Sequence, residues 1–96
     1  MKLPASIKIG KTRYNVYWRD AWDSVAGILR PSIKALSVAT RWRGAPRKPE
    51  DVAETFWHEV THAILYDMDH PLWRDEKFVT AFSKRLSKAI NSARFS

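Results

Sequence analysis

PEDVAETFWHEVTHAILY, residues 49–66, carries the strongest structural signal in the chain. Its apolar residues recur at intervals of three and four, the periodicity of a helix with one buried face. Pro49 suits the first position of a helix, and Glu50 and Asp51 complement the positive end of the helix dipole. We therefore predict a helix from about Pro49 to Tyr66. Its apolar face comprises Val52, Ala53, Phe56, Trp57, Val60, Ala63 and Ile64.

The middle of this segment is the motif His58-Glu59-Val60-Thr61-His62. Two histidines four residues apart on a helix project from one face, so both imidazoles can reach one metal ion. Neutral imidazole binds zinc at about 2.0–2.1 Å. Glu59 lies about 100° around the helix from His58, where its carboxylate can take a proton from a zinc-activated water. The motif predicts a Zn²⁺ site on His58 and His62, with Glu59 as catalytic general base.

A catalytic zinc site needs a third protein ligand, and the residues leave its identity open. The metzincin arrangement requires glycine at position 65 and a ligand at 68, where this chain has leucine and methionine, so that class is excluded. An acid from the next helix remains. We expect Glu76, in the first turn of that helix, because its side chain reaches further than that of Asp75, which suits an N-cap. Asp69 and His70, in the connecting segment, are the other candidates.

Strand-like segments precede the helix, and one more helix follows it. Alternating, aromatic and β-branched residues mark candidate strands, bounded by glycine and proline, at 7–9, 14–18, 27–29 and 33–40. Residues 41–48, which are basic and contain Gly44 and Pro46, predict a loop. Taken coarsely, the order is β-β-β-α-α. The predicted fold class is α+β, with an N-terminal three-stranded antiparallel sheet followed by the HExxH helix and a C-terminal helix.

The C-terminal helix is predicted from an N-cap at Asp75 to about Ala93. Its apolar residues are expected to pack against the first helix; they are Phe78, Val79, Phe82, Leu86 and Ile90. With 96 residues, the chain is predicted to form a single domain over 1–96. So small a core gains from any folding energy that a bound metal contributes.

The composition limits both the metal site and the location of the protein. Cysteine is absent, which excludes disulfides and thiolate ligands and leaves His, Asp and Glu to hold a metal. The first residues lack an apolar signal-peptide core, and no 18-residue apolar run occurs. We therefore predict a cytoplasmic protein that makes no membrane contact.

Charge is distributed unevenly along the chain. Residues 1–48 carry eleven Lys or Arg against two acids, a net charge of +9, whereas residues 49–96 carry six against eight, a net charge of −2. The basic half also contains Trp18, Trp22 and Trp42. It predicts contact with nucleic acid or an acidic protein, and the alternative is an ordinary solvated surface.

Residues 49–65 and 75–82 together resemble small phage and prophage HExxH proteins, which are similar to the ImmA/IrrE-like and SprT-like zinc metallopeptidases. The resemblance spans roughly residues 25–90, and the motif His58-Glu59-x-x-His62 is its specific part. It implies a small zincin-like domain of the minigluzincin type, with zinc held by His58, His62 and Glu76 and with Glu59 as general base. It would place a phage-encoded chain in the host cytoplasm. Tyr66 is the one candidate for stabilising a transition state.

Two functions of different classes follow from these features. The first is a zinc metallopeptidase that cleaves a peptide or protein substrate, which would pair as an extended strand along a sheet edge at about Leu36–Thr40. The second is a non-enzymatic module for phage–host interaction or nucleic-acid binding, in which zinc acts as a structural staple. Structural zinc is normally closed by four protein ligands, whereas two histidines and one acid leave a position open.

Overall fold

The computed structural model describes residues 3–95. In chain order its elements are β1 (Ser6–Ile9), β2 (Thr12–Ala21), β3 (Gly27–Arg30), a 3-10 turn (Pro31–Ile33), β4 (Ala35–Trp42), β5 (Ala45–Pro46), α1 (Pro49–Asp67) and α2 (Glu76–Ser92). The predicted α+β class is confirmed. Both helices lie where the sequence predicts them, because each begins with residues that favour a helix N-terminus: Pro49 opens α1, and Asp75 caps α2.

The strands form one mixed five-stranded sheet in the order β1-β2-β4-β3, with β5 pairing β4. β1 runs antiparallel to β2 and β3 antiparallel to β4, but β2 and β4 are parallel. The predicted three-stranded antiparallel sheet is therefore wrong in strand number and in direction. After β3, the 3-10 turn sends β4 back into the space between β2 and β3. This pairing joins segments about twenty residues apart in sequence, so no local pattern reports it.

The location of the sheet edge also differs from the prediction. β4, which contains Leu36–Thr40, is an interior strand paired on both sides. The free edge next to the helices belongs to β3, because β3 pairs only with β4. The segment 41–48, predicted as a loop, contains the end of β4 and the short hairpin to β5.

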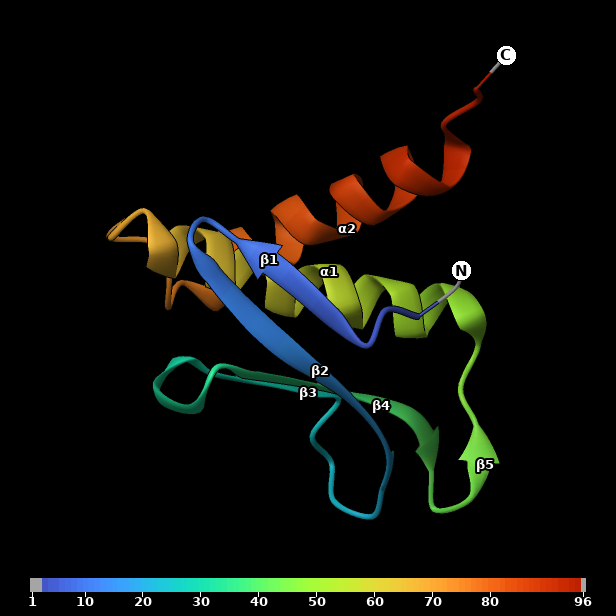
Figure 1. The fold of residues 1–96 in the computed structure, drawn as a ribbon. Coiled ribbons are helices and arrows are strands. Elements are labelled where there is room, and N and C mark those ends of the chain that lie inside the picture. The colour runs from blue at the N-terminus through green and yellow to red at the C-terminus, as the bar shows by residue number, and fades with distance from the viewer. Residues whose placement is uncertain (1–2, 96) are drawn as a thin grey trace.

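The elements are stacked in three layers (Figure 1). Helix α1 lies across one face of the sheet, and α2 packs on the far side of α1. The core between the sheet and α1 is formed by Ile9, Tyr14, Val16, Leu36, Val38, Val52, Phe56, Val60 and Ala63. Both helices are on the same side, so the opposite face of the sheet has no helix over it within the described residues 3–95. In the described part of the chain, no helix is both long enough and apolar enough to cross a membrane.

Helix α2 packs on α1 with a different face from the predicted one. Its buried residues are Val79, Ser83 and Ser87, whereas Phe78 and Phe82 are 36% and 48% exposed. The two serines are small and let the helices approach closely. They also share a helical face with Glu76, so this rotation of α2 turns Glu76 toward α1.

Candidate metal centre

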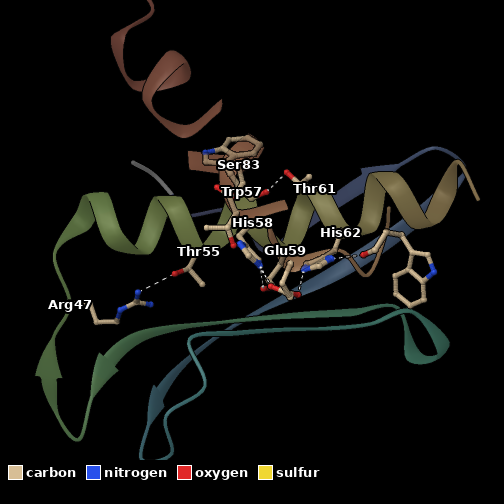
Figure 2. A network of polar contacts seen from close by, with 11 residues as sticks. Arg47, Thr55, Trp57, His58, Glu59, Thr61, His62 and Ser83 are labelled. Carbon is tan, nitrogen blue, oxygen red and sulfur yellow. Dashed lines mark hydrogen bonds and ion pairs between the residues drawn. The ribbon is translucent and has the colours of Figure 1, made fainter. Parts of the chain in front are cut away.

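Two imidazoles of α1 and one carboxylate of α2 meet at a single point. His62 Nε2 lies 2.7 Å from Glu76 Oε1, and His58 Nε2 lies 3.0 Å from Glu76 Oε2. Each of the three residues offers a ligand atom within 4.8 Å of the others, which no other group of His, Asp and Glu achieves within residues 3–95. Figure 2 shows the side chains of His58, Glu59 and His62 converging on the side of α1 that faces the sheet.

The remaining candidates for the third ligand lie elsewhere. Asp75 caps α2 by accepting a hydrogen bond from the backbone N–H of Phe78 at 2.9 Å. His70 Nδ1 accepts from the backbone N–H of Leu72 at 3.1 Å, and Asp69 takes a positive φ of 51° just after α1. The structure thus brings Glu76 to the histidine pair and holds Asp75, Asp69 and His70 in local turn and capping roles.

The hydrogen bonds of His62 are those of a ring that could bind a metal ion. His62 Nδ1 lies 2.6 Å from the carbonyl oxygen of Trp73, an acceptor to which only a protonated nitrogen can donate. If the ring is neutral, its other nitrogen, Nε2, carries a lone pair that faces Glu76 Oε1 at 2.7 Å. Two hydrogen-bond acceptors at this distance repel each other unless a proton or a cation lies between them. Two imidazole nitrogens and one carboxylate oxygen are a donor set that would hold such a cation. The Trp73 carbonyl supplies the outer hydrogen bond typical of a zinc-bound histidine.

Glu59 lies beside this group without joining it. Its carboxyl is buried, 7% exposed overall, and Oε2 is 4.0 Å from His58 Nε2. Burial raises the pKa of Glu59 to about 7; the negative charge of Glu76 adds to the rise, and His62 opposes it. Burial also lowers the pKa of His58, against the attraction of Glu76, and so favours the neutral imidazole that metals require.

The group opens into a cleft of about 510 Å³ between α1, the edge strand β3 and the segment that leads into α2. Residues 26–29, Trp73 and Arg74 are among those that line it. Tyr66, the predicted candidate for stabilising a transition state, is not among the cleft residues. Its ring instead packs edge-on against Trp73, with the ring centroids 5.1 Å apart.

Sequence reasoning missed two residues that shape the cleft. Arg47, in the segment predicted as a loop, donates to the carbonyl of Ala39 at 2.7 Å and to Thr55 Oγ1 at 3.0 Å, and so ties α1 to β4 (Figure 2). Nothing in its local sequence marks it out. Gly27 is the second, and a glycine inside a strand-like segment is a signal of close backbone approach.

At Gly27 the edge strand approaches α1 so closely that a side chain does not fit. A Cβ atom there would lie 2.8 Å from Glu59 Cγ, 2.9 Å from Glu59 Oε2 and 2.9 Å from Thr55 Cγ2. The missing side chain therefore leaves the space that the Glu59 carboxyl occupies. Because Gly27 has no side chain, Glu59, the general-base candidate, can occupy this position.

We predict that Gly27→Ala lowers the free energy of unfolding by about 1–3 kcal/mol, as overpacking does in a filled site. Urea denaturation measures the change. In a Glu59→Ala background the same substitution should cost less, because two of the three crowded atoms are gone. Equal costs in the two backgrounds would show that Gly27 does not make room for Glu59.

Comparison with known proteins returns no match: no protein-family profile, no curated protein and no solved structure is similar to this chain.

Proposed function

We propose that this protein is a zinc-dependent peptidase. One observation carries the proposal: His58, His62 and Glu76 present three ligand atoms within 4.8 Å of one another, with the buried carboxyl of Glu59 beside them in an open cleft. Two imidazoles and one carboxylate are a ligand set that catalytic zinc uses, and three protein ligands leave a position for water or substrate.

The zinc ion, when bound, polarises the scissile carbonyl and lowers the pKa of water in the cleft. The chain supplies the proton transfers. Glu59 accepts a proton from the water as the water oxygen bonds to the carbonyl carbon, and passes it to the departing amine when the C–N bond breaks. Burial beneath Gly27 keeps the Glu59 carboxyl out of bulk water and in a fixed position.

The edge strand β3 supports a peptide as the substrate class. β3 pairs with β4 on one side only, and its residues 27–29 line the cleft that contains Glu59. The unpaired backbone N–H and C=O groups of an edge strand bind an extended peptide by adding it to the sheet. The substrate would thus lie along β3, with its scissile bond over the histidine pair.

The competing function is a non-enzymatic module in which zinc is a structural staple. A staple has no use for Glu59, which is buried and is not one of the three converging ligands. Burying a carboxyl away from water destabilises the folded protein, and a purely structural zinc site would gain no benefit that offsets this loss. The buried Glu59 beside the three ligands therefore favours hydrolysis.

The test combines metal analysis with a peptide-cleavage screen. We expect protein purified without chelator to contain about one zinc per chain by elemental analysis, and to generate new termini in a mixed peptide library analysed by mass spectrometry. A chelator should stop cleavage, and added zinc should restore it. Zinc-loaded protein that raises its melting temperature but cleaves no peptide would support the staple instead, and protein without bound metal would contradict both functions.

A further inference from the structure

The uncovered face of the sheet has a composition that the proposed peptidase site does not explain. Side chains alternate between the two faces of a strand. Ile7, Ile9, Tyr14, Val16 and Leu29 point into the core under α1. Their neighbours therefore point to the opposite face, which Figure 1 shows without a helix over it. We define the open face by Lys8, Arg13, Asn15, Tyr17, Ile28, Arg30, Ala35 and Ser37.

Positive charge on the open face is not neutralised by the protein. Within residues 3–95, no carboxylate forms an ion pair with Lys8, Arg13 or Arg30. The only acid in the five described strands is Asp20, and it accepts a hydrogen bond from the backbone N–H of Gly44. Asp23, in the following loop, is already paired with Arg19.

The register of β1 and β2 makes this charge costly. Lys8 and Arg13 are directly opposite one another in the antiparallel pair. Like charges in this position destabilise a sheet, and Arg13 donates a hydrogen bond to the hydroxyl of Ser6, which carries no charge. An anionic partner that contacts both side chains would remove the repulsion.

An exposed aromatic ring lies in the same surface. Tyr17 is 53% exposed and is paired across the sheet with Ser37, which in turn is paired with Ile28. The central strand β4 contributes the small residues Ala35 and Ser37, so nothing on it covers the ring. A sheet face that presents an exposed aromatic ring together with cations offers stacking for unpaired bases and contacts for phosphates.

We propose that the open face binds single-stranded nucleic acid, with phosphates on Lys8, Arg13 and Arg30 and a base stacked on Tyr17. Single strands are favoured over a duplex because only an unpaired base exposes its face for stacking on Tyr17. The open face and the metal centre are on opposite sides of the sheet, so this proposal does not depend on peptidase activity.

The test measures binding of the full chain to fluorescein-labelled oligothymidylate by anisotropy, from 25 to 200 mM salt. The triple variant Lys8→Ala/Arg13→Ala/Arg30→Ala should bind about 100-fold more weakly at 0.1 M salt and lower the salt slope by about 2, since each phosphate contact on a single strand contributes about 0.7. Tyr17→Ala should weaken binding about 10-fold with an unchanged salt slope.

A matched control removes the same charge elsewhere. Lys84→Ala/Arg85→Ala/Lys88→Ala lies on exposed positions of α2, and it should change the affinity less than about 3-fold. Lys8→Ala alone removes the repulsion with Arg13 and should therefore raise the melting temperature. Weaker nucleic-acid binding by this variant would then not be a consequence of unfolding. Equal losses in the two triple variants, an unaffected Tyr17→Ala, tighter binding of duplex DNA, or displacement by polyglutamate as readily as by unlabelled oligonucleotide would each overturn the proposal.

Discussion

Glu59→Gln is expected to reduce peptide cleavage by about 100- to 10,000-fold, the usual contribution of a positioned general base, while zinc content stays near one per chain. Glutamine has the same shape as the buried glutamate but cannot take a proton from water. The zinc content should hold because Glu59 is not among the three converging ligands. Cleavage rate and bound zinc are measured on the same preparation.

The matched control is Glu50→Gln, the same chemical change in the exposed first turn of α1, at a residue that is not among those lining the cleft. It should leave cleavage unchanged. Burial raises the pKa of Glu59 from 4.5 to about 7, so the folded state of the metal-free protein loses stability as pH rises through that interval. Glu59→Gln should therefore melt no lower than the unmodified chain at pH 8 in chelator. A Gln variant with full turnover would remove Glu59 from the mechanism.

Glu76→Ala is expected to weaken zinc binding by at least about 10-fold, and by more if the carboxylate binds the ion directly, since even indirect partners of a ligand contribute 10- to 100-fold. The Glu76 side chain is 69% exposed, so its loss should change the stability of the metal-free protein little. The substitution should thus lower the melting temperature in zinc but not in chelator. Competition with a chromophoric chelator measures the affinity.

Asp75→Ala is the adjacent comparison. It removes the hydrogen bond that caps α2 and should cost about 1 kcal/mol of stability both with and without zinc. The two variants are therefore expected to differ: Glu76→Ala should lower the melting temperature only when zinc is present, and Asp75→Ala should lower it with and without zinc. Normal zinc affinity in Glu76→Ala, or a metal-dependent loss in Asp75→Ala, would show that the third ligand is assigned wrongly.

Short-range interactions made much of the candidate site predictable. His58 and His62 share a face because a helix repeats every 3.6 residues, and Pro49 and Asp75 mark where the two helices begin. Glu76 could be favoured because it follows a cap and has a long side chain. Its approach to the histidines, however, requires α2 to face α1 with Val79 and Ser83 rather than with Phe78 and Phe82, which the apolar stripe did not predict.

The sequence by itself determined the helices, the spacing of the two histidines, the general-base candidate and the basic character of the first half, because each depends on residue type and on neighbours within a few positions. Only the tertiary structure decided that β4 enters between β2 and β3, that β3 is the edge beside the cleft, and that Gly27 makes room for Glu59. It also decided that Lys8 and Arg13 face away from the helices. These features arise from packing between segments far apart in the chain, where the burial of a whole sheet face outweighs any local preference.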